Sequence, residues 1–133
     1  MAIVSAEGLP ISVSTASASP HEVTLVIQTL EDRHVEELPA RLIGDMAYDS
    51  DQLDAELAEE WKIEMIAPHR SNRVRPATQD GRPMRRYRKR WKVERFFAWL
   101  GNSRRVLVRH DFHWANYLGW VQLASILMLL AHL

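Results

Sequence analysis

The sequence contains no cysteine, so disulfide frameworks, thiolate zinc sites and cysteine nucleophiles are all excluded. It has no glycine-rich phosphate loop and no nucleophile elbow, which leaves nucleotide hydrolysis and acyl transfer without a supporting motif. The first residues lack the basic segment and the apolar run of a secretory signal. No repeat of fixed period is present, which argues against a solenoid.

The residues that are present are typical of a packed domain. The chain has 133 residues, of which 47% are apolar and 26% are charged. That length suits one domain with a modest core, and that composition is too apolar for intrinsic disorder. We expect one domain over residues 1–133, made of an acidic part (1–68), a basic loop (69–84) and a helical part (85–133).

The formal net charge is zero, but charges of opposite sign are separated along the chain. Residues 1–68 contain fourteen Asp or Glu and three Lys or Arg, whereas residues 69–109 contain fourteen Lys or Arg and two acids. Clustered positive charge favours binding to a polyanion such as a phosphate backbone, because bound counterions are released. The alternative is that the acidic and basic halves neutralise each other within the molecule.

The acidic part begins with a predicted hairpin. Two short β-favouring runs, residues 1–4 and 11–13, flank a turn that contains Gly8. A helix is then expected to start at Ser19 or Pro20, because serine is a common N-cap and proline fits the first helical position.

The rest of the acidic part predicts a strand, a helix and a second strand. The apolar run 41–46 places Asp45 at the end of the first strand, and residues 63–67 form the second. Asp49 or Ser50 is expected to cap the helix between them. Short connections predict parallel pairing of these strands, and the hairpin ahead of them would make the sheet mixed.

The basic loop and the helical part differ in their patterns. Prolines and basic residues in 69–84 predict an exposed, mobile loop. Apolar residues at helical spacing predict one helix over 85–100. Residues 114–133 form an apolar stretch that, at about 1.5 Å rise per residue, is just long enough to span a bilayer. Polar residues interrupt the stretch, so we expect a buried core helix instead.

Three polar side chains of the predicted basic helix lie on one narrow strip between its apolar and basic faces. Tyr87, Arg90 and Glu94 are three and four residues apart, which places them on successive turns. Glu94 is the single acid of this helix, and by itself it indicates a salt-bridge partner of its basic neighbours.

The spacing Tyr87-xx-Arg90-xxx-Glu94, within RRYRKRWKVERFFAWL, resembles the C-terminal signature of bacterial insertion-sequence transposases of the DDE type. The segment IGDMAYDS, residues 43–50, is similar to the one in which that family places its second catalytic Asp. Two earlier segments, GLP and PHEV, resemble stretches that precede it, so the resemblance covers nearly the whole chain.

The resemblance implies an α/β, RNase H-like mixed sheet with flanking helices, truncated at its N-terminus, and a role in DNA transposition. In that family two Asp and one Glu hold two divalent ions that activate the attacking oxygen and stabilise the leaving one. Carried over to this chain, Asp45 and Glu94 would be ligands of Mg²⁺ or Mn²⁺, and Tyr87 and Arg90 would be catalytic positioning residues. DNA phosphate contacts would come from the basic residues Arg85, Arg86, Arg88, Lys89, Lys92, Arg95, Arg104 and Arg105.

The implied partners are transposon ends and target DNA, together with a second copy of the chain or a full-length transposase. The implied location is the bacterial cytoplasm, associated with the nucleoid and without membrane attachment.

The sequence departs from the family pattern at the first catalytic Asp, which lies upstream of a hairpin resembling residues 3–13. In a shifted register its position is Ser5, and serine cannot replace an anionic bridging ligand. Gly101 stands where the family tends to have Lys or Arg. We therefore expect a segment that is inactive alone, with weak or absent metal binding. The alternative is a non-catalytic DNA-binding or oligomerisation module derived from a transposase.

Other clusters of polar or aromatic residues give less support for a functional site. Asp49, Asp51 and Asp54 lack the spacing of a calcium loop, so helix capping and solvation are favoured over calcium. His110 and His113 lack a third zinc ligand and are expected at the surface. The tryptophans are expected in the core or lining a groove, and among them Trp91 offers a ring on which a displaced base could stack.

Overall fold

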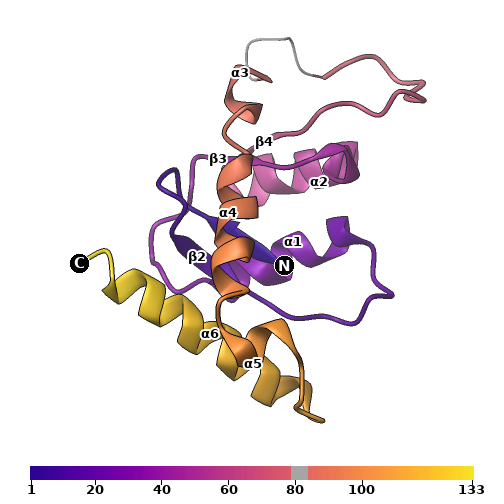
Figure 1. Ribbon diagram of the computed structural model, residues 1–133. Helices are drawn as coiled ribbons and strands as arrows, with labels where there is room; N and C mark the ends of the chain where they lie inside the picture. The colour runs from indigo at the N-terminus through magenta and orange to yellow at the C-terminus, as the bar shows by residue number, and fades with distance from the viewer. Residues whose placement is uncertain (79–83) are drawn as a thin grey trace. The chain divides into compact units, whose positions relative to one another are not determined.

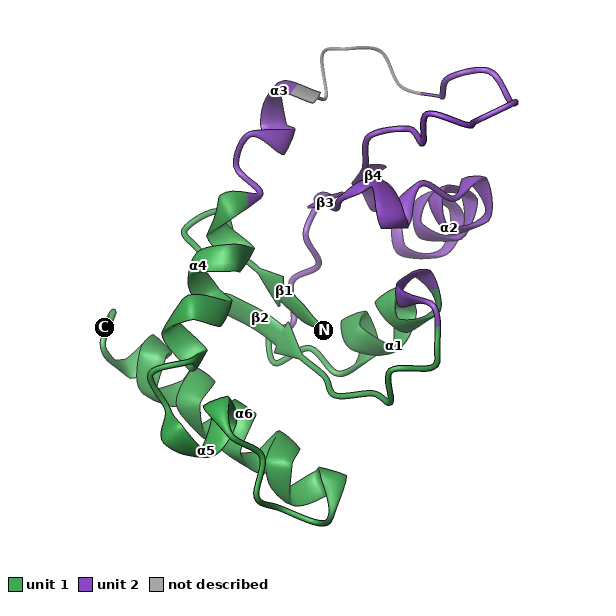
Figure 2. Cartoon of the chain, turned by 45° about the vertical axis from the view of Figure 1, so that its right-hand side comes forward, with its two compact units in different colours: residues 1–20, 24–35, 91–133 green, residues 21–23, 36–90 purple. Residues whose placement is uncertain are grey.

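Figure 1 presents the computed structural model of the protein, which describes residues 1–78 and 84–133. These residues form short β-strands and α-helices, which confirms the α/β class. They divide into two compact units, coloured separately in Figure 2. Unit 1 comprises Met1–Pro20, Thr24–Val35 and Trp91–Leu133, and unit 2 comprises His21–Val23 and Glu36–Arg90, so neither unit is continuous in sequence.

Unit 1 is built on the predicted hairpin. Strands β1 (Ala2–Val4) and β2 (Pro10–Val13) pair antiparallel. In the turn between them the Ser5 hydroxyl accepts hydrogen bonds from the amides of Glu7 and Leu9. Gly8 has φ +89°, in the left-handed region that residues other than glycine rarely adopt.

The two faces of the hairpin contact different helices. On one face the Ser12 hydroxyl donates to the carbonyl of Thr29, at 2.5 Å, in α1 (Leu25–Glu31). A 3₁₀ turn, η1 (Glu22–Thr24), leads into α1, so the predicted helix start at Ser19 or Pro20 is wrong. Neither residue is helical, because the first turn forms later and with 3₁₀ geometry, as is frequent at helix N-termini.

On the other face Val13 packs into the core of unit 1. Its partners are Phe96 and Leu100 of α4 (Trp91–Leu100) and Val121 and Met128 of α6 (Trp114–Leu130), with α5 (Arg104–Leu107) beside α6. Figure 2 shows α4 and α6 across the hairpin from α1. The alternation of Ser12 and Val13 follows from the period of two in a strand.

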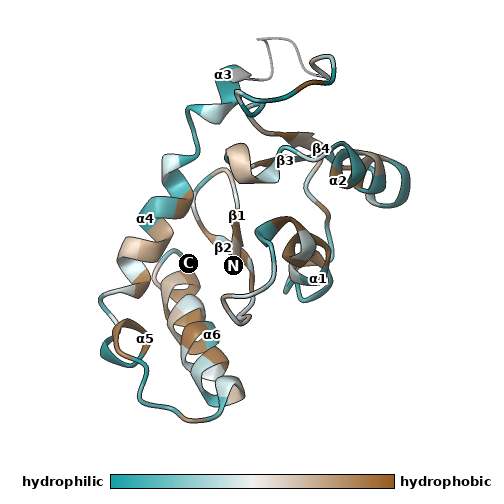
Figure 3. Ribbon diagram, turned by 90° about the vertical axis from the view of Figure 1, so that its right-hand side faces the viewer, coloured by the Kyte–Doolittle hydropathy of each residue, from teal (hydrophilic) through white to brown (hydrophobic). Residues whose placement is uncertain are grey.

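Helix α6 contributes to the core of unit 1 as expected, but only one stripe of it is buried. Val121, Ser125 and Met128 face the core. Apolar side chains on the rest of the helix are exposed, namely Leu123, Ile126, Leu127 and Leu130. Figure 3, in which the ribbon is coloured by hydropathy, shows many hydrophobic residues along α6. Among the residues that the structure describes, no helix is both long and apolar enough to cross a membrane.

The predicted helix over 85–100 is also wrong, because it is interrupted. Helix α3 (Met84–Tyr87) ends in a turn at residues 88–90, and α4 begins at Trp91. The Lys89 amide donates to the Arg86 carbonyl and the Arg90 amide to the Tyr87 carbonyl within that turn. In a continuous helix, the basic residues of 85–92 would lie three or four residues apart on neighbouring turns. Repulsion between their like charges destabilises such a helix.

Unit 2 contains the predicted parallel strand–helix–strand unit. Strand β3 (Arg41–Ile43) pairs in parallel with β4 (Glu64–Ile66), Leu42 opposite Met65. Between them lie a 3₁₀ turn, η2 (Met46–Tyr48), helix α2 (Asp51–Glu56) and a π-helical turn, η3 (Leu57–Trp61). Their buried core consists of Leu53, Leu57, Ile63, Met65, Ile66 and Ala67. The described strands form two separate two-stranded sheets and not the single mixed sheet expected.

Substitutions of the adjacent residues Phe96 and Phe97 test the packing of unit 1. Phe96 is 1% exposed and Phe97 49% exposed. Phe96→Ala removes a ring from a filled core, so the free energy of unfolding should fall by about 3–5 kcal/mol in urea titrations. Phe97→Ala serves as the matched control and should cost less than about 1 kcal/mol. Equal losses from the two substitutions would contradict this packing.

Candidate functional site

Asp45 lies just beyond β3, at the position the sequence predicts. The preceding Gly44 is held by its amide, which donates to the Ile66 carbonyl at 3.0 Å. A Cβ at Gly44 would lie 2.5 Å from the Met65 side chain, so the backbone here approaches its neighbours closely. The Asp45 Oδ1 atom accepts a hydrogen bond from the Ala47 amide at 2.8 Å and thereby caps η2. The strand and the cap together fix this carboxylate.

Tyr87 and Arg90 lie in the same unit as Asp45. The Arg90 Nη1 atom is 3.7 Å from the Asp45 Oδ2 atom, and both side chains are about two-fifths exposed. The Arg90 guanidinium also lies over the Tyr87 ring, 5.6 Å from its centroid. The structure therefore brings Asp45, Tyr87 and Arg90 together. The turn at residues 88–90 places Arg90 beside Asp45. Because this turn interrupts the helix, Tyr87, Arg90 and Glu94 do not lie on one strip of a continuous helix, and that prediction is wrong.

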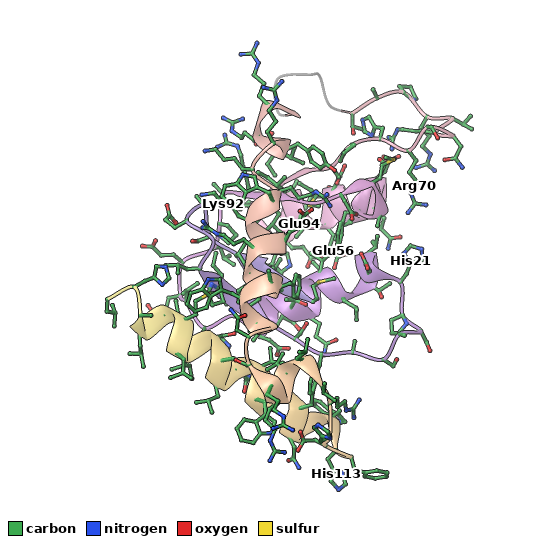
Figure 4. The ribbon with its side chains drawn as sticks, in the orientation of Figure 1. His21, Glu56, Arg70, Lys92, Glu94 and His113 are labelled. Atoms are coloured by element: carbon green, nitrogen blue, oxygen red, sulfur yellow. The ribbon has the colours of Figure 1, made fainter. Side chains whose placement is uncertain are left out.

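Glu94 belongs to unit 1, on the first turn of α4, where its side chain is exposed. Its basic neighbours hold the hairpin turn: Lys92 donates to the Ala6 carbonyl, and Arg95 donates to the Glu7 carbonyl at 3.0 Å. Both cations also lie over the Trp91 ring, Arg95 at 4.8 Å from the centroid. Figure 4 shows Lys92 and Glu94 leaving different sides of α4. Trp91 is thus a half-exposed partner of two cations and not a core residue.

Four basic side chains of α3 and the turn after it are exposed: Arg85, Arg86, Arg88 and Lys89. We call this set the arginine-rich turn. Within residues 1–78 and 84–133, none of the four forms an ion pair with a carboxylate. Their positive charge is therefore not neutralised by the described acidic residues.

Another group of basic residues is neutralised, and sequence reasoning missed it. Arg73 donates to Asp49 at 2.9 Å and to Asp51 at 2.5 Å, and its side chain is only 12% exposed. Arg75 also donates to Asp51, at 2.9 Å. The Arg70 guanidinium donates to the carbonyls of Met46 and Ala47, the first two residues of η2. We call Asp49, Asp51, His69, Arg70, Arg73 and Arg75 the acid–arginine cluster.

Asp49 is the centre of this cluster. It accepts hydrogen bonds from the Arg70 amide and the His69 Nδ1 atom, both at 2.8 Å. The His69 Nε2 atom accepts from the Thr78 amide, so this nitrogen carries no proton and the Nδ1 atom is the donor to Asp49. Burial raises the pKa of Asp49, but the hydrogen bonds from Arg70 and His69 and the charge of Arg73 outweigh it and lower the pKa overall.

These contacts bear on two predictions. Asp49 does not cap α2, because Ser50 does so by accepting from the Leu53 amide, which confirms the other alternative. Residues 69–78 form no helix or strand and most of them are exposed, as predicted, but Asp49 and Asp51 bind the side chains of His69, Arg73 and Arg75. Residues 79–83 of the predicted loop lie outside the described part. Neutralisation between the acidic and basic segments is confirmed for this cluster and for Arg90 with Asp45.

A family model described as "Transposase DDE domain" matches residues 1–129. The chain belongs to this transposase family. The membership confirms the resemblance to DDE transposases and supports a role in DNA transposition. No curated protein and no solved structure matches the chain.

Transposases of this family generally use divalent metal ions. In the described part no group of three or more His, Asp or Glu side chains could hold an ion. Asp45 is committed to the cap of η2 and lies beside Arg90, and the Ser5 hydroxyl serves the hairpin turn. His110 and His113 are both exposed.

Asp54, on α2, has a carboxyl group whose titration is changed by folding. Burial raises its pKa to about 6, and the nearby charges of Asp51 and Asp49 add to the shift. Folding therefore favours the protonated form of this group. Its contribution to stability is fully present below the ordinary pKa of 3.8 and is lost as the pH rises through about 6.

Asp54→Asn tests this shift, because asparagine stays neutral at every pH. The substitution should increase the free energy of unfolding more at pH 7.5 than at pH 4.5, measured by urea titration at both. Glu59→Gln removes the same charge from an exposed position and should show a smaller difference. An Asp54→Asn effect that is the same at both pH values would contradict the assignment.

Proposed function

We propose that the chain takes part in DNA transposition as a DNA-binding part of a DDE transposase, with an RNase H-like arrangement of its catalytic residues. The observation that carries the proposal is the arginine-rich turn. Its four cations have no carboxylate partner in the described part, although acidic residues neutralise Arg73, Arg75 and Arg90 nearby in sequence. Positive charge left exposed in this way binds the phosphate backbone through counterion release.

Two groups of residues would make the proposed DNA contacts. The arginine-rich turn gives affinity and orientation without base specificity, because its donors reach phosphate oxygens. Lys92, Arg95, Arg104 and Arg105 are the second group, and they belong to unit 1. Lys92 and Arg95 also hold the hairpin turn, so their loss would disturb unit 1 as well as DNA contacts.

The proposed catalytic residues are Asp45, Glu94, Tyr87 and Arg90. Asp45 and Glu94 are two carboxylates of the kind that bind Mg²⁺ or Mn²⁺ in the family. Arg90, stacked on Tyr87 beside Asp45, would position that carboxylate or bind a terminal phosphate. Because Ser5 cannot act as an anionic ligand, we propose that this chain binds metal weakly or not at all and does not cleave DNA alone.

The proposed setting is a bacterial insertion sequence, with the chain corresponding to the C-terminal part of the catalytic domain. Its partners would be transposon ends and target DNA. Further proposed partners are a second copy of the chain or a full-length transposase. The proposed location is the cytoplasm, at the nucleoid.

Replacing Arg85, Arg88 and Lys89 by Ala tests the DNA contacts. In gel-shift titrations with duplex DNA, the triple variant should bind more weakly at low salt. The slope of log affinity against log salt should flatten by about 0.9 for each phosphate contact removed, up to about 3.

The control is a variant with Arg41, Lys62 and Arg75 replaced by Ala, which loses the same charge from another part of unit 2. It should keep most of the affinity and of the salt slope. Equal loss in both triple variants would indicate a response to net charge alone, and absence of duplex binding at low salt would remove the proposal.

The second candidate function is an oligomerisation module derived from a transposase. The exposed apolar side chains of α6 favour it, because Ile126, Leu127 and Leu130 are each more than half exposed and form one apolar surface. Surfaces of this kind are common at contacts between proteins.

Leu127→Glu and Leu130→Glu test the second candidate together. If α6 joins copies of the chain, light scattering after gel filtration should show a dimer or larger species for the native protein and a monomer for the double variant. Trp114→Glu, at the other end of α6, is the control and should leave the mass unchanged. A monomeric native protein at high concentration would exclude this function.

A further inference from the structure

The connection between α5 and α6 has a pocket with an unusual lining. A cavity of about 320 Å³ is lined by Arg104, Arg105 and His110. In the described part no carboxylate pairs with any of the three. Asp111, the nearest acid in sequence, does not line the cavity. The pocket therefore presents several donors and no acceptor of opposite charge, which suits an anion.

Other contacts keep this pocket in place. The Arg105 guanidinium lies over the Trp120 ring at 5.2 Å, a contact that leaves its N–H groups available. Arg109 donates to the carbonyls of Asp111 and Phe112 and lies over Tyr117 at 5.7 Å. Arg109 thus fixes the connection, and Arg104, Arg105 and His110 remain free to bind a ligand.

Exposed aromatic rings adjoin the pocket in sequence. Phe112 is 91% exposed and Trp114 is 63% exposed. The Phe112 ring meets His113 edge to face, at 5.2 Å between centroids. Figure 4 shows His113 at the outer end of the connection, pointing away from the helices. A phenylalanine this exposed contributes almost nothing to the core, so its ring is available for contact with another molecule.

We propose that this pocket binds a backbone phosphate of single-stranded DNA and that the adjacent base stacks on Phe112. The inference rests on the proposed DNA-binding function and specifies that the α5–α6 connection binds single-stranded DNA. Cationic grooves with aromatic platforms are the general means of binding unpaired strands, because every base has a face for stacking. In a duplex those faces are covered by neighbouring bases, so Phe112 cannot stack there without unpairing the helix.

Fluorescence anisotropy with a labelled oligo-dT of about 15 nucleotides and with a duplex tests the inference. Phe112→Ala should weaken oligo-dT binding by about tenfold, the loss typical of one stacking contact, and leave duplex binding within about twofold. Phe112→Trp should restore oligo-dT binding, because it returns an aromatic face. Val74→Ala, at a residue 97% exposed, is the control and should change neither affinity.

Three further results would overturn the inference. The first is oligo-dT affinity that Phe112→Ala leaves unchanged, and the second is failure of Phe112→Trp to restore it. The third is a Phe112-dependent affinity for acidic peptides or anionic vesicles instead of oligo-dT. The arginine-rich turn variant separates this inference from the proposed function: loss of duplex binding with Phe112-independent oligo-dT binding overturns the inference alone. Phe112-dependent oligo-dT binding without duplex binding overturns the proposed duplex contacts alone.

Discussion

The ion pairs of Asp49 and Asp51 with Arg73 are the interaction on which the charge distribution of unit 2 depends. Asp49 is 5% and Arg73 12% exposed, so removing either partner would leave the other charge buried and uncompensated, at a cost of about 3–5 kcal/mol. The same pairs bind residues 69–75 to the start of α2. They neutralise Arg73 and, through Asp51, Arg75, whereas the arginine-rich turn has no carboxylate partner in the described part.

Elements whose signals are local in sequence were predictable. The hairpin follows from two β-favouring runs around Gly8, and the parallel unit follows from two apolar runs with a capped helix between them. The position of Asp45 after β3 follows from the same pattern. The interruption at residues 88–90 was not predicted, because an apolar period describes one face of a helix and ignores repulsion among the basic residues on the others.

Contacts between residues far apart in the chain could not be predicted from the sequence. Asp49 and Asp51 favour helix capping by their local context, and their actual partners lie more than twenty residues away in the chain. Helix α6 is apolar on all sides, so its sequence does not indicate which stripe is buried. Glu94 remains a predicted ligand, since its place in unit 1 follows from α4 and its role from the family resemblance.

Arginine modification by phenylglyoxal, read by mass spectrometry with and without duplex DNA, tests most directly the division between neutralised and available cations. Arg85, Arg86 and Arg88 should react in the free protein and be protected when DNA is bound. Arg73 should be protected in both conditions, because carboxylates already hold its guanidinium. Rapid modification of Arg73 in the free protein, or modification of the arginine-rich turn that DNA does not reduce, would contradict this division.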